Sequence, residues 1–362
     1  MIWQELKKIN WWITGTVLIL GILGIVFIYS AGFDGEKINP IYQKQIVWWL
    51  IGFLGFVLAY YVDFRTLGSN AYILYALSIF ILMGVLFKGR ISHGAQSWIN
   101  IAGFSLQPSE IMKLVMVFVL ARYLSDHQLE KHRLKFLFMP FILSIIPLIL
   151  IIKQPDLGTA MIFMPIIFAM VFAAGARLKY LINLMIVSAM SIPFFWMFLH
   201  EYQKDRIRVF LNPNIDPLGA GYTIIQSKIA IGSGGLFGKG WLSGTQSQLN
   251  FLPERHTDFI FSVIGEEWGL AGTFFLIFCY FKLIQTALDI TQHTRDKFGV
   301  YMVLGIVSIF TLQVVINIGM VMGVFPVVGI PLPLISYGRS SLLSFILMMG
   351  FLVNLSKQKS FH

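Results

Sequence analysis

The chain alternates between long runs of apolar residues and short polar connections. The apolar runs are long enough to cross a lipid bilayer as helices. Because only helices and closed barrels satisfy their backbone hydrogen bonds in lipid, the pattern predicts an all-α, polytopic membrane protein of about ten transmembrane helices. The whole chain, 1–362, is expected to form a single integral membrane domain. The expected spans are 11–31, 44–62, 70–87, 108–124, 136–152, 158–175, 180–199, 259–281, 298–324 and 333–355.

The composition agrees with this class of protein. Hydrophobic residues make up 57% of the chain, more than soluble domains carry, and only 12% of the residues are charged. The net charge of +10 does not indicate nucleic-acid binding, because the basic residues are scattered between the spans and form no single cluster. The lone cysteine, Cys279, excludes a disulfide within the chain and a cysteine-based metal site.

The distribution of lysine and arginine predicts the orientation. Basic residues in short loops gather on the cytoplasmic side of membrane proteins. Most of them fall on the side that holds both termini, so both termini are expected in the cytoplasm. The long segment 200–258, between the seventh and eighth spans, is then outside, together with loops 88–107, 153–157 and 325–332. The unusual polar residues gather on this outer side, where ATP is not available.

A dense group of charges stands directly before the eighth span. Glu254, Arg255, His256 and Asp258 are almost contiguous, and a very apolar segment follows. Charges at the mouth of an apolar helix are costly to place, which indicates a functional site. The alternative is a structural role, in which Thr257 or Asp258 caps the helix.

The same region has a polar helical face. On a helix of 3.6 residues per turn, Asp258 shares one face with a stripe of small and polar residues, whereas Glu267 points to the opposite side. The stripe consists of Ser262, Gly265, Glu266, Gly269 and Gly272. This face is expected to meet other helices or a cavity, which places Asp258 at the entrance of an extracytoplasmic site.

Polar residues near the outer ends of the fourth and sixth spans are further candidates. Glu110 and Lys113 share a helical face, either as a functional pair within the membrane or as an ion pair that joins two helices. Asp156, which follows Gln154 in a short outer turn, is either a helix cap or a ligand contact. Trp98 is either a substrate contact or an interfacial anchor, the role typical of a lone tryptophan at this depth.

The long outer segment contributes cations close to the acidic region. They are Arg206, Arg208, Lys228, Lys239 and Arg255. Such a set suits an anionic substrate at the outer membrane surface, and the alternative is attraction of a solvated basic loop to lipid headgroups. The glycine-rich run 232–240 lacks a Walker-type motif, so it is only a weak phosphate signal.

One apolar segment does not fit a regular helix. Residues 325–338 contain three prolines and two glycines. Because proline removes a backbone donor and breaks a helix, we expect a kinked or re-entrant element that is buried in protein.

Together these motifs resemble the SEDS family (shape, elongation, division and sporulation), whose members build bacterial peptidoglycan. The resemblance covers essentially the whole chain and is carried by the blocks Gly94–Lys113, Gln154–Thr159, Gly219–Gly240, Phe251–Gly269, Asn317–Gly323 and Pro331–Gly338. Within the family the chain is similar to the elongation branch, RodA, and less to the division branch, FtsW; the clearest signs are Asp216–Tyr222, Gln226–Gly235, Gly244–Gln248 and Pro253–Asp258. One departure is Arg339, where the family pattern Ser-Tyr-Gly-Gly-Ser-Ser has a glycine.

The resemblance implies a reaction and partners. A member of this branch is a peptidoglycan glycosyltransferase that polymerises lipid II at the outer face of the bacterial cytoplasmic membrane and releases undecaprenyl pyrophosphate. It works with a class B penicillin-binding protein, the transpeptidase that crosslinks the product, and with other proteins of the elongation machinery. Nucleic acid is not an expected partner.

Asp258 is the expected catalytic residue. As a general base it would take the proton from the acceptor 4-hydroxyl group while that oxygen attacks the donor anomeric carbon with inversion. Apolar neighbours would raise its pKa, whereas Arg255 and His256 would lower it. The candidate substrate-binding residues are Trp98, Glu110, Lys113, Gln154, Asp156, Arg206, Arg208, Lys239, Glu254, Arg255, His256 and Ser336.

The sequence leaves the metal requirement and two other functions open. A divalent cation, Mg²⁺ or Mn²⁺, is a candidate companion of the leaving pyrophosphate, and Glu110 and Asp156 either hold it or position Lys113. A flippase for lipid II or a similar polyprenyl lipid would need essential polar residues through the whole membrane depth. A non-catalytic scaffold for cell-wall enzymes would tolerate substitution of Asp258.

Overall fold

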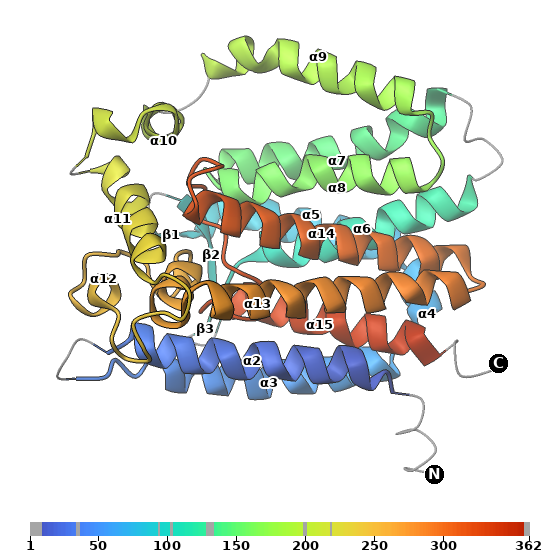
Figure 1. Cartoon of the computed structure of the whole chain (residues 1–362). Helices are drawn as coiled ribbons and strands as arrows, with labels where there is room; N and C mark the ends of the chain where they lie inside the picture. The colour runs from blue at the N-terminus through green and yellow to red at the C-terminus, as the bar shows by residue number, and fades with distance from the viewer. Residues whose placement is uncertain are drawn as a thin grey trace.

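A bundle of long helices forms the body of the protein. The computed structural model describes residues 9–33, 37–92, 95–101, 104–127, 134–197, 201–217 and 219–357. Figure 1 shows the long helices packed side by side, with α9 at the edge of the bundle. In the described ranges, the helices that coincide with the expected spans are α2 (Trp11–Ala31), α3 (Ile41–Tyr61), α5 (Ala71–Lys88), α6 (Pro108–Asp126), α7 (Leu134–Lys153), α8 (Leu157–Ala173), α9 (Leu178–Trp196), α13 (Ile260–His293), α14 (Lys297–Val321) and α15 (Arg339–Ser356).

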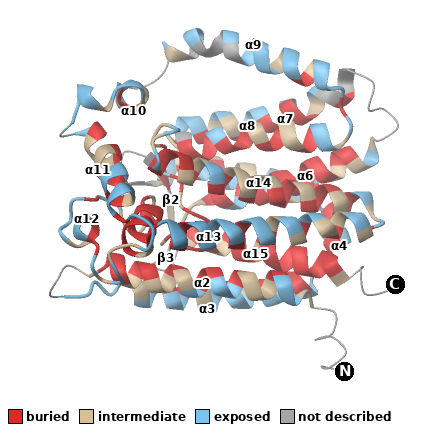
Figure 2. Cartoon of the chain, in the orientation of Figure 1, coloured by how far each residue is buried: buried red, intermediate tan, exposed pale blue. Residues whose placement is uncertain are grey.

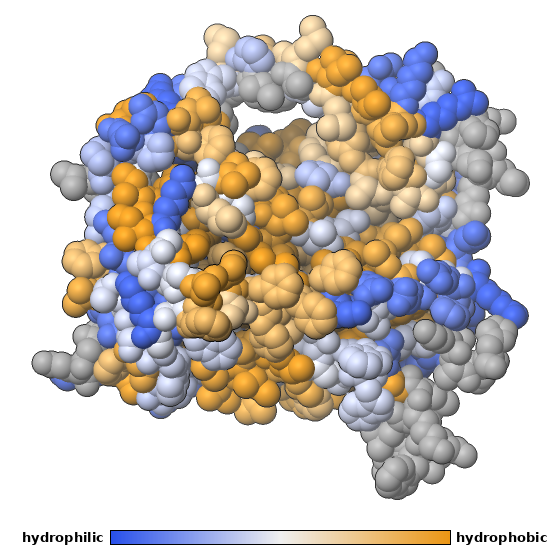
Figure 3. Space-filling view, viewed as in Figure 1, coloured by the Kyte–Doolittle hydropathy of each residue, from blue (hydrophilic) through white to orange (hydrophobic). Residues whose placement is uncertain are grey.

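The outer surface of the bundle is suited to lipid. Among the described residues, α2, α3, α13, α14 and α15 are long and apolar enough to cross a membrane, and α5, α7, α8 and α9 contain shorter apolar stretches. Large apolar side chains such as Leu58, Phe80 and Phe274 are more than half exposed. Apolar side chains cover the middle of the bundle and polar ones gather at its two ends (Figure 3). In Figure 2 the residues of α15 are mostly coloured as buried, whereas those of α3 are mostly coloured as exposed.

Both chain ends approach the same end of the bundle. There the short helix α4 (Phe64–Ser69) follows α3, and the Arg65 guanidinium pairs with Asp296 at 3.3 Å. At the C-terminal end of α15, the Lys357 ammonium donates to the Tyr60 carbonyl at 2.7 Å. These contacts gather basic residues that the sequence places on one side of the membrane.

The opposite end of the bundle carries the irregular structure. Residues 88–107, expected as a loop, instead form a three-stranded antiparallel sheet in which β2 lies between β1 and β3, with Asn100 opposite Ser105. The long segment between α9 and α13 folds into short helices against this end. The elements are β1 (Arg90–Ser92), β2 (Ala95–Ile101), β3 (Phe104–Leu106), α10 (Glu201–Leu211), η2 (Pro213–Ile215), α11 (Ala220–Ser233) and α12 (Thr245–Gln248).

The helix α13 is kinked near its start. Gly269 has φ 62° and ψ −156°, a conformation that essentially only glycine adopts. The backbone groups freed by the kink pair with the glycine-rich loop, because Leu270 N donates to Gly235 O at 2.9 Å. A Cβ atom at Gly269 would lie 2.4 Å from Gly238 N. The loop and the kink therefore fit together only when glycine occupies this position.

Segment 325–338 is the non-helical element that its prolines predict, and it is buried from 332 to 336. Its carbonyl groups accept hydrogen bonds from helix side chains. Asn317 Nδ2 donates to Ile330 O at 2.6 Å, and the Tyr280 hydroxyl donates to Pro333 O at 2.7 Å. These bonds replace the helical ones that proline removes, which allows irregular backbone to lie inside the bundle.

Most helix ends lie within about three residues of the expected boundaries, with two exceptions. The last helix was expected from 333 but begins at Arg339, because the chain as far as Gly338 belongs to the proline-rich segment. The eighth span was expected to end near 281 but continues to His293 as part of α13.

Candidate active site

A cavity of about 610 Å³ lies at the end of the bundle that carries the small sheet. Its wall combines β2 and β3, the first turns of α6 and α8, α10, the turn before α13, α14 and the segment from 328 to the first turn of α15. Its volume is in the range of small-molecule binding sites. The expected site residues that line it are Trp98, Glu110, Asp156, Arg206, Glu254 and Asp258.

Asp258 lies in the turn immediately before α13. Its backbone carbonyl accepts a hydrogen bond from Asn317 Nδ2 at 2.9 Å, which ties the turn to α14. Its carboxylate lies against Gly329, where a Cβ atom would be 3.4 Å from Asp258 Oδ2. Gly329 has φ +71° and no side chain, so the proline-rich segment can pass close to the carboxylate. In the part of the chain that the structure describes, this carboxylate accepts no hydrogen bond.

The surroundings of Asp258 favour its neutral form. Burial is the main cause and the negative charge of Glu254 adds to it, whereas the positive charge of Arg206 opposes both; together they raise the pKa of Asp258 to about 7. Glu254 has φ 49° and its Oε2 atom accepts from the Thr257 hydroxyl at 3.0 Å. A carboxylate with a pKa near neutrality can accept and release a proton under physiological conditions.

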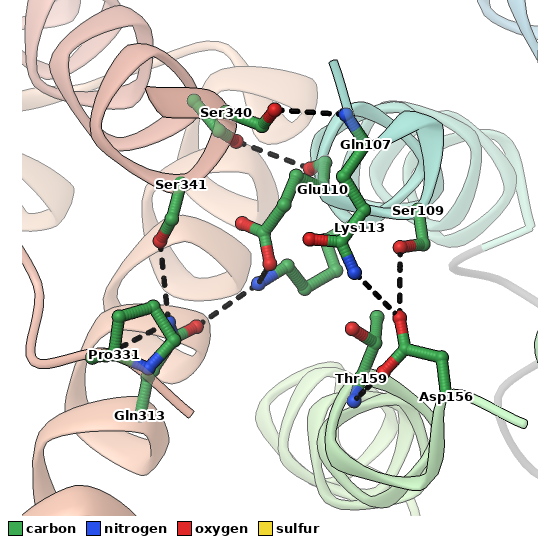
Figure 4. Close-up of polar contacts among 11 residues, drawn as sticks. Gln107, Ser109, Glu110, Lys113, Asp156, Thr159, Gln313, Pro331, Ser340 and Ser341 are labelled. Atoms are coloured by element: carbon green, nitrogen blue, oxygen red, sulfur yellow. Dashed lines mark hydrogen bonds and ion pairs between the residues drawn. The ribbon is translucent and has the colours of Figure 1, made fainter. Parts of the chain in front are cut away.

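A buried ion pair lies beside the cavity (Figure 4). Lys113 Nζ is 2.8 Å from Glu110 Oε1, and their side chains are 1% and 5% exposed. The ammonium also donates to Gln313 Oε1 at 3.0 Å, and Gln313 Nε2 donates to Pro331 O at 3.2 Å. Glu110 Oε2 is buried and has no hydrogen-bond partner among the described residues. The pair thus joins α6 to α14 and to the proline-rich segment, and one carboxylate oxygen remains available.

Asp156 is a helix cap, one of the two roles expected of it. Its Oδ1 atom accepts from Thr159 N at 3.1 Å and caps α8. Its Oδ2 atom accepts from Gln107 Nε2 at 2.7 Å and from the Ser109 hydroxyl at 3.1 Å (Figure 4). The carboxylate therefore joins the start of α8 to the start of α6 while it borders the cavity.

Three other expected residues support the wall from behind and do not line the cavity. Gln154 is buried, and its Nε2 atom donates to Leu82 O at 3.0 Å. The Ser336 hydroxyl donates to the Thr257 carbonyl and accepts from Leu332 N. The ring of His256 lies 6.0 Å from that of Tyr337, and burial lowers the pKa of His256.

Most of the expected cations lie away from the cavity wall. Arg255 donates to the Ala31 carbonyl and to Asn250 Oδ1, which anchors the turn to the end of α2. Arg208 is half exposed and pairs with Asp205 at 2.8 Å. Lys239 pairs with the buried carboxylate of Glu266 at 2.8 Å. Arg206 is the member of the expected set that reaches the cavity.

The start of α13 also differs from the sequence expectation. Neither Thr257 nor Asp258 caps this helix: Phe259 occupies the N-cap position, because residues 253–259 form turns. The polar stripe faces α11 and the glycine-rich loop, as the 2.9 Å contact between the Ser262 and Ser227 hydroxyls shows. Glu267 points elsewhere, as predicted, and accepts a hydrogen bond from Ser30 in α2.

Several residues of the cavity wall had no expected role. They are Gln107, Gln313, Tyr337, Ser340 and Ser341, and with them Arg339, which was noted only as a departure from the family pattern. Ser340 Oγ accepts from Gln107 N at 2.8 Å, and Gln313 Nε2 lies 3.5 Å from Ser341 Oγ (Figure 4). The only sequence signal for Gln313 is its isolated amide within an apolar span.

Comparison with known proteins gives consistent matches over nearly the whole chain. The family profile of the FtsW, RodA and SpoVE proteins, described as cell cycle proteins, matches residues 10–361. The peptidoglycan glycosyltransferase MrdB of Escherichia coli K12 is 42% identical, with 92% of this chain and 89% of that protein covered. The peptidoglycan glycosyltransferase RodA of Treponema pallidum is 32% identical, with 95% and 96% covered.

Solved structures agree with these relatives. A chain from a peptidoglycan synthase complex, described as coordinating polymerization and crosslinking, superposes with a TM-score of 0.82 at 31% identity and covers 96% of this chain and 97% of its own. The rod shape determining protein RodA of Thermus thermophilus gives a TM-score of 0.72 at 27% identity, with 96% of both chains covered. The chain is therefore a polytopic membrane protein that belongs to the FtsW, RodA and SpoVE family, the SEDS family that its motifs resemble.

Proposed function

We propose that this protein is a peptidoglycan glycosyltransferase that polymerises lipid II at the outer face of the bacterial cytoplasmic membrane during cell elongation and the maintenance of rod shape. The names of its relatives support the reaction class. The single observation that carries the proposal is the state of Asp258. Its carboxylate borders a large cavity, accepts no hydrogen bond within the described ranges and has a pKa of about 7.

Asp258 acts as the general base. It takes the proton from the acceptor 4-hydroxyl group while that oxygen forms a bond to the anomeric carbon of the donor. The bond between this carbon and the diphosphate breaks on the opposite side, and the diphosphate keeps the bonding electrons. One base and no covalent intermediate are sufficient for inversion. The burial that raises the pKa of Asp258 also stabilises the protonated product of this step.

A divalent cation, Mg²⁺ or Mn²⁺, belongs to the proposal as a companion of the substrate. Among the described residues, no group of three His, Cys, Asp or Glu side chains is placed to hold a metal ion. Glu110 Oε2 is the fitting protein ligand, because it is buried without a partner beside the cavity. Magnesium is commonly bound through one or two carboxylates and substrate phosphates. Such an ion would neutralise charge on the leaving diphosphate.

The proposed orientation places the cavity outside the cell and both termini in the cytoplasm. The predominance of basic residues at the end that holds the termini supports it. The proposed partner is a class B penicillin-binding protein that crosslinks the glycan product within the elongation machinery. The structural similarity to a chain from a complex that coordinates polymerization and crosslinking supports this partner.

The distribution of buried charge favours an enzyme over a flippase. Within the described ranges, the charged side chains that are buried are Glu110, Lys113, Glu266 and Glu267. They lie within the first two or three turns of α6 and α13, at the end of the bundle that carries the cavity. A transporter that moves a charged headgroup across the bilayer needs polar groups along its whole path.

The test is polymerisation of lipid II by the purified protein bound to its transpeptidase partner. Asp258→Asn keeps the size of the side chain and removes the base, so we expect glycan-strand synthesis to be abolished while the melting temperature is not lowered. Measuring lipid II translocation on the same reconstituted preparation separates the alternatives. Full synthesis by folded Asp258→Asn protein would refute the role of Asp258, and translocation without synthesis by the unmodified protein would refute the enzyme.

A further inference from the structure

Carboxylates outnumber cations on the described wall of the cavity. Its described wall holds four carboxylates, those of Glu110, Asp156, Glu254 and Asp258. The wall cation from the expected set is Arg206. A lipid-linked diphosphate would bring further negative charge into this space, and like charges at close range oppose binding. Binding of a diphosphate therefore calls for another positive group on the wall.

Arg339 supplies this group. It is the first residue of α15, follows the N-cap Gly338, and lines the cavity. Its Nε atom donates to the Tyr337 hydroxyl at 3.3 Å, and this is the one hydrogen bond of its side chain within the described part of the chain. An arginine side chain has five N–H donors, so the outer edge of the guanidinium remains available for a ligand. Planar paired donors match the geometry of phosphate oxygens.

The helix that begins at Arg339 strengthens the site. Ser340 and Ser341, the next two residues, also line the cavity. The first backbone N–H groups of a helix have no partner within the helix, and the helix dipole is positive at this end. The guanidinium and the helix start therefore present positive potential to the same space. The guanidinium adds a full positive charge and side-chain donors to those of the helix terminus.

Arg339 is also held in a fixed relation to Asp258. Tyr337 N donates to the His256 carbonyl at 2.9 Å, and the Ser336 hydroxyl donates to the carbonyl of Thr257. These bonds join the chain just before Arg339 to the chain just before Asp258. The cation and the carboxylate therefore sit on one hydrogen-bonded frame.

We propose that Arg339 binds the diphosphate of the lipid-linked substrate and product, with its guanidinium on the phosphate oxygens. The inference rests on the proposed function, because the substrate class comes from there. When the anomeric carbon–oxygen bond breaks, the diphosphate retains the electron pair, and Arg339 stabilises that charge. The family pattern has glycine here, so Arg339 adds a second cation to the cavity wall beside Arg206.

The test is binding of undecaprenyl pyrophosphate to the purified protein in detergent, with undecaprenol as the uncharged control lipid. We expect Arg339→Gln to weaken binding of the pyrophosphate lipid about tenfold, in line with the loss of charge-assisted hydrogen bonds, and to leave undecaprenol binding unchanged. Arg339→Lys should recover part of the lost binding, because lysine keeps the positive charge but lacks the paired N–H donors of the guanidinium. Lys44→Gln is the matched control, because Lys44 is an exposed cation in the first turn of α3 at the same end of the bundle.

Two results would overturn the inference. Arg339→Gln protein that binds undecaprenyl pyrophosphate as tightly as the unmodified protein excludes the contact. Equal loss for both lipids assigns Arg339 to packing of the cavity. The outcome is separate from the proposed function, which fails only if the unmodified protein does not polymerise lipid II. A steady-state comparison adds a second readout, in which Arg339→Gln raises KM for lipid II.

Discussion

The rate of lipid II polymerisation should rise with pH through the neutral range, because the proposed base must be ionised to accept a proton. With the pKa of Asp258 at about 7, the ionised fraction is about one tenth at pH 6 and about nine tenths at pH 8. We therefore expect the initial rate to increase about tenfold over this interval. An aspartate with an ordinary pKa would already be ionised at pH 6, and the rate would then stay flat.

Two neighbouring charges should move this pH profile in opposite directions. Glu254 raises the pKa of Asp258, so Glu254→Gln should shift the midpoint to lower pH; Arg206 lowers this pKa, so Arg206→Gln should shift the midpoint to higher pH. His256 also titrates, but burial lowers its pKa, so His256→Gln should leave the midpoint in place. The midpoint is read from initial rates at constant ionic strength, which separates it from any loss of maximal rate.

The reasoning fails if the rate is flat between pH 6 and pH 8 while the protein stays folded. It also fails if the Glu254 and Arg206 variants shift the midpoint in the same direction, because their charges have opposite signs. Melting curves recorded at each pH provide the control for folding.

Three further predictions concern stability. The folded-state pKa of Asp258 lies above its unfolded value, so ionisation of this carboxyl group destabilises the fold as pH rises above about 4. At pH 8, Asp258→Asn should therefore melt at a higher temperature than the unmodified protein, with a gain in unfolding free energy of at most about 4 kcal/mol because the carboxylate also borders the cavity. A difference that persists at pH 4 would contradict this. Lys113→Met leaves the buried Glu110 carboxylate without its cation and should lower the free energy of unfolding by about 3–5 kcal/mol. Adding Glu110→Gln should recover stability. A double variant no more stable than Lys113→Met alone would refute the pairing argument. Glu266→Ala removes the acceptor for Lys239 Nζ and for two backbone N–H groups of α12, so limited proteolysis should cut the glycine-rich loop faster, and an unchanged cleavage pattern would contradict this.

The transmembrane helices were predictable because a long apolar run in lipid must satisfy its own backbone hydrogen bonds, and a helix does so. The same argument could not place the start of the last helix. Residues 333–338 are as apolar as a span, but their carbonyl groups are satisfied by side chains such as Tyr280, far away in the sequence. The small sheet at 88–107 was hidden for another reason, since two of its three strands are only three residues long.

The candidate site could be predicted only in part. Asp258 and Glu110 stand out because charge is rare in an apolar chain. Gln313 and Asn317 do not, because a neutral amide in a span has no pattern of its own, and their acceptors lie in a segment whose path follows from the tertiary fold. The loop cations show the same limit: Lys239 could equally have faced the cavity, and only the fold of the loop brings it to Glu266.

The positions of the cations explain how the proposed base can have a pKa near neutrality inside a site that binds anions. A guanidinium or ammonium paired directly with Asp258 would lower its pKa and weaken it as a proton acceptor. Lys113 is held by Glu110 and Gln313, and Arg339 by the Tyr337 hydroxyl. The buried Glu110–Lys113 pair has a desolvation cost, and it fixes the ammonium beside the cavity without pairing it to Asp258. Binding of negative charge and acceptance of a proton then occur at different points of one cavity, which inverting transfer from a diphosphate requires.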